Sequence, residues 1–327
     1  MSEYLRVIVT GAAGFIGSHA VKALLRAGHS VLGIDNLNDY YDSKLKTDRL
    51  ESIWAPERFE FEEVDVSEYE KIEQIFEKYR PARVLHLAAQ AGVRYSIENP
   101  FSYVESNLKG HLSILEAVRA STSVEHLVYA SSSSVYGNDT QVPFSENDRA
   151  DKPVSLYAAT KRADELLSES YSNLYNLRQT GLRFFTVYGP WGRPDMAYWL
   201  FTKAIFESKP ITVFNGGNLE RDFTYIDDVI KTTVKIVQST PKNAGNYIYN
   251  LGGSRSRDVN EFIEIIANAC GKPALRQNYP MQQGDVYKTC ADVEKISTDY
   301  GYKPSVELEV GIPRFVDWYK QYYKLEL

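Results

Sequence analysis

The sequence predicts an α/β protein with a doubly wound parallel sheet and a second, smaller α/β domain. Short β-branched runs alternate with amphipathic stretches over the first 130 residues, and a glycine-rich turn joins the first run to the first amphipathic stretch. After Tyr188 this alternation gives way to shorter segments interrupted by proline and glycine. Because strands that alternate with helices pair in parallel, the first part of the chain should form one large sheet covered by helices on both faces.

Each expected element has its own local pattern. Arg6–Thr10 is short, apolar and β-branched, which is typical of a buried strand. The next stretch has apolar residues at helical spacing from Ile16 to Leu24 and ends at Gly28. By the same criteria, the strands are expected at 6–10, 31–34, 59–64, 83–87, 126–130 and 181–185, the helices at 16–26, 69–79, 103–119 and 156–174, and a returning strand at 247–251.

Composition excludes several classes of protein. The 327 residues are 43% hydrophobic and 24% charged with a net charge of −6, so a broad nucleic-acid surface is not expected. Two cysteines form neither a zinc site nor a disulfide scaffold, and the five histidines lack metal-ligand spacing, so no metal is expected. The apolar stretches are too short to span a bilayer, and residues 1–6 leave no room for a signal peptide. The chain is therefore expected to be cytoplasmic, away from membranes.

The glycine-rich turn predicts a dinucleotide site. Gly11 permits a tight turn, Gly14 lets the backbone approach a pyrophosphate, and Gly17 allows the helix to pack closely on the strand. The amino terminus of the following helix supplies free N–H groups for the phosphates. Asp35 ends the second strand 18 residues after Gly17, where a carboxylate binds ribose hydroxyls and repels a 2′-phosphate. Its neighbours Asn36 and Leu37 offer no cation, so NAD is favoured over NADP.

The other expected NAD contacts lie at the ends of later strands and in the helices expected at 103–119 and 156–174. Asp65 and Val66 fall where the adenine ring should lie, and the small residues after the fourth strand let the cofactor cross. The complete predicted set is Gly11, Ala13, Gly14, Phe15, Ile16, Gly17, Asp35, Asn36, Asp65, Val66, Leu87, Ala88, Ala89, Asn107, Tyr157, Lys161, Phe184 and Val187.

A catalytic group is predicted from three residues. Tyr157 and Lys161 are four apart and therefore share one face of a helix. A free tyrosine has a pKa of ~10, and a nearby ammonium favours the phenolate that a general base requires. Ser132 belongs to a hydroxyl cluster at the carboxyl end of the fifth strand, where open α/β sheets bind ligands. We interpret Tyr157, Lys161 and Ser132 as the catalytic residues.

With these motifs the chain resembles the extended short-chain dehydrogenase/reductase family of nucleotide-sugar enzymes, whose fold is a Rossmann sheet with a smaller substrate domain. The glycine motif, Ser132 25 positions before Tyr157, and the Tyr157–Lys161 pair carry the resemblance. Within the family the chain looks most like the UDP-glucuronate 4-epimerases. That closer likeness rests on AQAGVRYS at 89–96, LRFFTVYGPWGRPDM at 182–196 and RDFTYIDD at 221–228. Serines at 132–134 replace the Thr-Asp-Glu run of nucleotide-sugar dehydratases, which argues against water elimination.

The resemblance also implies the domain limits and the substrate contacts. Residues 1–182 with 222–253 should form the NAD-binding domain, and 183–221 with 254–327 the UDP-sugar-binding domain. Residues 212–214 should line the uracil site, Arg221 should hold the diphosphate, and Gln282 and Asp285 should close over the uridine. Hydroxyls and Arg193 are candidates for the sugar carboxylate. The expected substrate residues are Ser132, Ser133, Ser134, Thr186, Arg193, Thr212, Val213, Phe214, Arg221, Gln282 and Asp285.

The activity implied by the resemblance is NAD-dependent, reversible C4 epimerisation of UDP-glucuronate through a 4-keto intermediate. Two enzymatic alternatives are a UDP-glucuronate decarboxylase, because the intermediate is a β-keto acid, and a 4-epimerase of neutral UDP-sugars. A non-catalytic NAD-binding scaffold is the alternative from a different class. The amphipathic helices at 103–119 and 156–174 are expected to pair across a two-fold axis as a four-helix bundle, which would make a homodimer.

Overall fold

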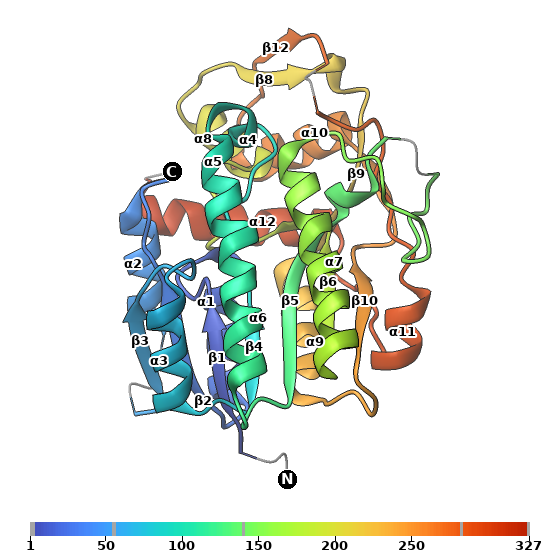
Figure 1. Ribbon diagram of the computed structural model, residues 1–327. Coiled ribbons are helices and arrows are strands. Elements are labelled where there is room, and N and C mark those ends of the chain that lie inside the picture. Colours follow the sequence, from blue (N-terminus) through green and yellow to red (C-terminus); the bar gives the residue numbers. More distant parts are fainter. Residues whose placement is uncertain (1–3, 54–56, 139–140, 282–283, 326–327) are drawn as a thin grey trace. The chain divides into compact units, whose positions relative to one another are not determined.

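The computed structural model describes residues 4–53, 57–138, 141–281 and 284–325, and its chain forms two compact units (Figure 1). Unit 1 combines residues 1–137, 149–184 and 230–249, and unit 2 combines 138–148, 185–229 and 250–327. The units therefore interleave along the sequence. The domain limits expected from the sequence remain a prediction.

A seven-stranded sheet organises unit 1, and its strand order confirms the predicted fold class. The order is β10-β6-β5-β4-β1-β2-β3, and the pairs from β6 through to β3 are parallel. From β1 the chain adds β2 and β3 on one side of the sheet and then β4, β5 and β6 on the other. The strand order therefore reverses between β1 and β4, and sheets of this kind bind ligands at such a switch point. The strands are β1 Arg6–Thr10, β2 Ser30–Asp35, β3 Phe59–Glu63, β4 Arg83–His86, β5 His126–Ser132, β6 Arg178–Phe184 and β10 Gly245–Leu251.

Helices cover both faces of this sheet. In Figure 1, α3, α6 and α7 lie on the near face and α1 lies behind β1. On the near face, Ile72 and Phe76 of α3 and Ile114 of α6 pack on Ile8 and Val84 of the sheet in one buried apolar cluster. The helices numbered up to α9 are α1 Phe15–Arg26, α2 Ser43–Glu51, α3 Tyr69–Tyr79, α4 Tyr95–Glu98, α5 Pro100–Tyr103, α6 Gly110–Ala120, α7 Leu156–Tyr175, α8 Ala197–Phe206 and α9 Ile226–Gln238.

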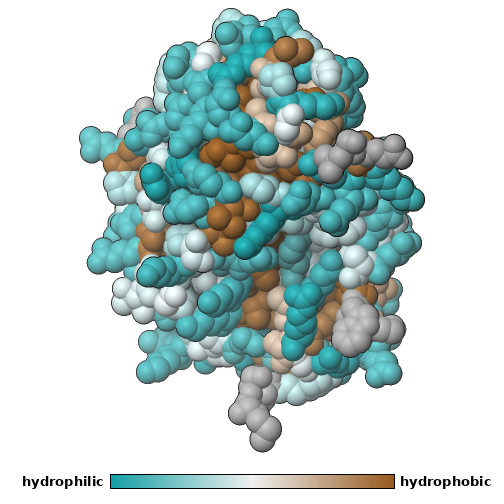
Figure 2. All heavy atoms as spheres, turned by 180° about the vertical axis from the view of Figure 1, so that it is seen from behind, coloured by the Kyte–Doolittle hydropathy of each residue, from teal (hydrophilic) through white to brown (hydrophobic). Residues whose placement is uncertain are grey.

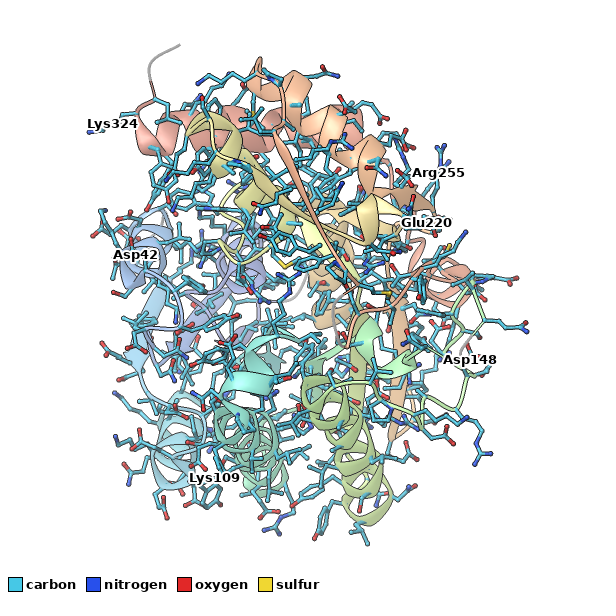
Figure 3. All side chains as sticks on the ribbon, turned by 90° about the horizontal axis from the view of Figure 1, so that it is seen from above. Asp42, Lys109, Asp148, Glu220, Arg255 and Lys324 are labelled. Carbon is cyan, nitrogen blue, oxygen red and sulfur yellow. The ribbon has the colours of Figure 1, made fainter. Side chains whose placement is uncertain are left out.

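The continuous helix expected at 103–119 is wrong in its first part. A π-helical turn spans Val104–Lys109 between α5 and α6. The side chain of Asn107 inside this turn donates to the carbonyl oxygen of Gln90, and its oxygen accepts from the Gln90 N–H at 2.8 Å. Lys109, labelled in Figure 3, ends the turn and pairs with Glu105. The turn is thus stabilised by tertiary contacts that helical periodicity does not reveal.

Unit 2 holds two small sheets and a helical layer with an aromatic core. The sheets have the orders β11-β9-β7 and β12-β8. Trp199 of α8 packs edge-on against Tyr319 of α12 with ring centroids 5.4 Å apart, and Phe315 lies against both. Its strands and remaining helices are β7 Thr186–Tyr188, β8 Ile211–Phe214, β9 Glu220–Tyr225, β11 Ser256–Asp258, β12 Arg276–Tyr279, α10 Val259–Cys270, α11 Glu294–Tyr300 and α12 Leu308–Tyr323.

The surface is mostly hydrophilic in the view of Figure 2, with hydrophobic patches of limited size. Within the described part of the chain, no helix is both long enough and apolar enough to cross a membrane.

Candidate active site

The glycine turn after β1 requires glycine at two of its positions. Gly11 has a φ of +69°, and a Cβ there would lie 2.8 Å from the Ala88 nitrogen in the segment after β4. A Cβ on Gly17 would lie 2.0 Å from the Gly11 carbonyl oxygen. The backbone of α1 can therefore come this close to the turn only without side chains. This cradle of bare backbone before a helix amino terminus suits the pyrophosphate of a dinucleotide.

Asp35 ends β2 beside the glycine turn. One carboxylate oxygen accepts from the Ala13 N–H at 3.1 Å, and the other accepts from the Leu37 N–H at 3.0 Å. Burial raises the pKa of Asp35, and the charge of Lys46 opposes this rise. The carboxylate is thus tied to the turn and lies where a ribose hydroxyl could donate to it.

Two cations near Asp35 were missed by sequence reasoning, which considered only the adjacent residues. Both lie on α2, a short and highly polar helix that was not predicted. Arg49 is fully buried and donates to the Ala13 carbonyl oxygen at 3.0 Å and to the Tyr41 hydroxyl at 2.7 Å. Lys46 donates to the backbone and side-chain oxygens of Asn38, both at 2.7 Å. Both cations thus bond to the protein itself, and Arg49 supports the glycine turn.

The ends of β2 and β3 are joined by side chains. Asn36 donates to one carboxylate oxygen of Asp65 at 2.7 Å, and the Ser67 N–H donates to the other at 2.9 Å. Burial opposes ionisation of this carboxyl, but the bonds from Ser67 and Asn36 hold the pKa of Asp65 below its usual value. Val66 is buried against α6, where a Cβ on Gly110 would lie 2.7 Å from it. These residues shape the surface on which the adenine ring is predicted to lie.

The catalytic candidates meet where α7 begins and β5 ends. The Ser155 side chain caps α7 by accepting from the Ala158 N–H, which places Tyr157 in the first turn. Lys161 lies one turn later and is buried, and its ammonium donates to the Ala130 carbonyl oxygen at 2.9 Å. Since Ala130 precedes Ser132 by two residues on β5, this bond joins the first turns of α7 to the end of the strand that carries the serine cluster.

The fifth strand is two residues longer than the 126–130 expected, because β5 continues through Ser132, and a 3₁₀ turn follows at Ser133–Tyr136. The Ser131 hydroxyl donates to Glu165 of α7 at 2.6 Å. Ser132 lies on the other face of the strand, and its hydroxyl is 3.2 Å from both the hydroxyl and the N–H of Ser134. Successive side chains of a strand point to opposite faces. Ser131, which bonds to Glu165, and the catalytic candidate Ser132 therefore lie on opposite faces of β5.

A buried ion pair beneath the cluster was also missed from the sequence. Glu165 accepts two bonds from the Arg183 guanidinium, at 2.8 and 2.9 Å, and a third from Arg162 at 2.7 Å. Burial opposes ionisation of Glu165, but the bonds and charge of Arg183 lower its pKa below the usual value. Arg183 stands in one of the motifs that carry the resemblance, yet the spacing of 18 residues gives no signal that the two side chains pair.

Asn107 is a predicted cofactor residue whose amide is engaged within the protein. Besides its two bonds to Gln90, it donates to the Thr160 hydroxyl of α7 at 3.0 Å. Its side chain is almost fully buried. In this structure Asn107 links the segment after β4 to the helix that carries Tyr157 and Lys161, and a direct contact with NAD remains a prediction.

Unit 2 carries most of the substrate candidates. On β8, Thr212 is exposed and Phe214 half-buried, whereas the Val213 side chain is buried and its backbone pairs with Asn278 of β12. Arg221 donates to Asp285 at 2.7 Å, so two candidates pair with each other. Arg193 likewise forms a two-bond pair with Asp195. Gln282 lies outside the described residues.

The remaining candidates lie in well-defined elements. Thr186 begins β7, followed by the buried Val187, and Phe184 ends β6 in unit 1. Among the described residues, no group of three or more His, Cys, Asp or Glu side chains forms a metal site.

Comparison with known proteins defines the class to which this fold and site belong. The NAD-dependent epimerase/dehydratase family model matches residues 7–252, so the chain belongs to this family. It is 47% identical to protein CapI of Staphylococcus aureus, with 98% of this chain and 100% of CapI covered. It is 45% identical to UDP-glucuronate 4-epimerase 2 of Arabidopsis thaliana, covering 97% of this chain and 76% of that one.

A solved structure agrees with these relatives. The UDP-glucuronic acid 4-epimerase of Bacillus cereus, crystallised with UDP-glucuronic acid and NAD, matches with a TM-score of 0.91 and 36% identity over 98% of this chain and 100% of that chain. The predicted fold class, family resemblance and NAD dependence are thereby confirmed.

Proposed function

We propose that this protein is an NAD-dependent UDP-glucuronate 4-epimerase, which interconverts UDP-glucuronate and UDP-galacturonate. The observation that carries the proposal is that the start of α7, with Tyr157 and Lys161, is bonded through Lys161 to the end of β5, which leads into the serine cluster, in a sheet that also bears the glycine turn. The named relatives and the solved epimerase with both ligands support the same activity.

The turn at Gly11–Gly17 fits the dinucleotide because a Cβ at either end would clash with backbone. Bound NAD supplies reversible hydride acceptance from C4 of the sugar. Tyr157 takes the proton from the C4 hydroxyl and returns it when the 4-keto intermediate is reduced on its opposite face. Ser132 donates a hydrogen bond to the same oxygen, and the Lys161 ammonium favours the phenolate of Tyr157.

The substrate contacts in unit 2 belong to the same proposal. Arg221 offers a guanidinium for the diphosphate, and Asp285 accepts from a ribose hydroxyl. The two side chains pair in this structure, so substrate binding would exchange some of these bonds for bonds to UDP. Ser133, Ser134 and Thr186 supply neutral donors for the sugar carboxylate.

The test is incubation of the purified protein with UDP-glucuronate, followed by chromatographic separation of the products. UDP-galacturonate is expected. Release of CO₂ with a UDP-pentose as the main product would instead establish a decarboxylase. Turnover of neutral UDP-sugars alone would establish a 4-epimerase of neutral UDP-sugars. Binding of NAD without any turnover would favour the scaffold.

Tyr157→Phe removes the general base and keeps the ring. Turnover should fall by ~10²–10⁴-fold, the usual contribution of acid–base catalysis, while NAD stays bound. Tyr175→Phe, the same change at the other end of α7, is the matched control and should leave turnover unchanged. Near-normal turnover of Tyr157→Phe would refute the assigned base.

We also propose a homodimer formed through α6 and α7. Both helices expose large apolar side chains, including Leu112 at 39%, Leu166 at 56% and Leu174 at 66% exposure. Burying these side chains in a four-helix bundle would remove them from water. Equilibrium sedimentation should give twice the chain mass of 37.2 kDa, and a single-chain mass would overturn the proposal. A cytoplasmic location is proposed on composition alone, and a fluorescent fusion tests it.

A further inference from the structure

Asp164 is a buried carboxyl that contacts the lysine of the catalytic pair. It lies on α7 one turn after Lys161, and its side chain is 1% exposed. One carboxyl oxygen accepts from the Lys161 ammonium at 3.1 Å. The other oxygen is buried and has no hydrogen-bond partner among the described residues.

A purely structural carboxyl is expected to have partners for both oxygens. Asp222 of unit 2 shows this arrangement. One of its oxygens accepts from the Ala291 N–H at 2.8 Å, and the other accepts from the Gly253 N–H. Asp164 differs, because among the described residues its carboxyl group has Lys161 as its only hydrogen-bond partner. The contacts of the Asp164 carboxyl therefore point to a role toward Lys161 of the catalytic pair.

The groups packed around Asp164 leave its charge balanced by Lys161 alone. Burial, with the charge of Lys161, lowers the pKa of His111 on α6 to about 3 and that of His86 on β4 well below its usual value, so both are neutral. Burial raises the pKa of Tyr129 on β5, which is therefore also neutral. Glu165, the next residue of α7, is paired with Arg183.

We propose that Asp164 is a positioning residue for the epimerisation: its carboxyl orients the Lys161 ammonium, and its negative charge weakens the influence of that ammonium on Tyr157. The proposal rests on the proposed function, in which Tyr157 acts as the base and Lys161 favours its phenolate. Asp164 acts through Lys161 and touches neither substrate nor reacting atoms.

The effect of the Asp164 charge on Tyr157 can be scaled from their spacing along α7. The two residues are seven apart on one helix, two turns or about 10 Å along its axis. Burial raises the pKa of Asp164 to about 7, against the opposing charge of Lys161. At an effective dielectric constant of ~20, one charge at ~10 Å corresponds to a shift of roughly one pH unit.

The test is the pH dependence of kcat/KM for UDP-glucuronate in the full-length protein with NAD bound. Asp164→Asn keeps an acceptor for Lys161 and removes the charge. The midpoint of the acid limb should move to lower pH by roughly one unit, since the phenolate then forms more easily. Glu169→Gln is the matched control, because it removes one negative charge from the exposed surface of the same helix. Its midpoint should stay at that of the parent.

An unchanged midpoint in Asp164→Asn, or one that moves to higher pH, overturns the proposal. If the parent protein itself does not turn over UDP-glucuronate, the proposed function fails first, and Asp164 is then tested without catalysis. Burial raises the pKa of both Asp164 and Asp222 to about 7, so NMR of protein ¹³C-labelled at the aspartate carboxyls should show signals that titrate near neutral pH, and only the Asp164 signal should have a midpoint that rises in Lys161→Met. This measurement also serves if Asp164→Asn does not fold. If no aspartate signal changes its midpoint in Lys161→Met, the proposed coupling between Asp164 and Lys161 is refuted.

Discussion

The buried pair of Glu165 and Arg183 gives a stability prediction whose sign depends on pH. Arg183→Met keeps an apolar stem of similar length and removes the guanidinium, which is 2% exposed and forms two bonds to Glu165. Removing one partner of a buried ion pair costs about 3–5 kcal/mol. Ser131 and Arg162 still bond to the carboxylate, so a loss near 3 kcal/mol is expected at neutral pH.

The pH dependence follows from the direction of the Glu165 pKa. In the parent protein this pKa lies below its usual value, so Glu165 stabilises the fold above its unfolded-state pKa, and the stabilisation is lost as the pH falls through the folded pKa. Without Arg183, burial prevails and the folded pKa of Glu165 rises. The variant then takes up a proton on folding, and its deficit against the parent should shrink as the pH falls from 8 to 5.

The assay is thermal unfolding of parent and variant across this pH range. At roughly 2–4 °C for each kcal/mol, the melting temperature should fall by about 6 °C or more at pH 8. Glu165→Gln combined with Arg183→Met should recover part of the loss, because the lone buried charge is gone. A deficit of equal size at pH 5 and pH 8 would refute the reasoning, and so would a double variant no more stable than Arg183→Met.

Two further predictions concern the cofactor and the substrate. Gly17→Ala should lower both stability and retained NAD, because the new methyl lies 2.0 Å from the Gly11 carbonyl oxygen. Mass spectrometry of the ligand released on denaturation measures this, and normal NAD content would contradict it. Thr186→Val should weaken binding of UDP-glucuronate more than of UDP-glucose and raise the UDP-pentose fraction, because a carboxylate donor is lost. Chromatographic product ratios test this, and unchanged preference and fidelity would show that Thr186 does not bind the carboxylate.

The sequence predicted the elements whose signal is local. The bounds predicted for the first strand and for the helix at Tyr69–Tyr79 agree with the structure at both ends. A buried β-branched run and a strongly amphipathic stretch can each be recognised from neighbouring residues alone. The strand expected at 247–251 does join the large sheet as part of β10. Helix α9 at Ile226–Gln238 has a clear apolar periodicity that was overlooked. Helix α2 is so polar that periodicity offers little.

The parts that could not be predicted depend on contacts between distant residues. The π-helical turn around Asn107 follows from bonds to Gln90 and Thr160, 17 and 53 residues away. The motifs identified Tyr157 and Lys161, but the spacing of residues along α7 does not show that Asp164 is buried against Lys161. Motifs thus identify the catalytic candidates, whereas the residues that contact these candidates from elsewhere in the fold can be found only in the structure.

The interleaving of the two units affects how the protein is synthesised. Strand β6 is complete at Phe184, but β10, its neighbour in the sheet, begins only at Gly245. At translation rates of ~5–20 residues per second, the ribosome needs roughly 3–12 s to make the roughly 60 residues between them. Throughout this interval β6 is an unpaired edge that can bind another nascent chain. Chaperone demand and aggregation during expression should therefore concentrate in this window, and slower codons between the two strands should worsen both.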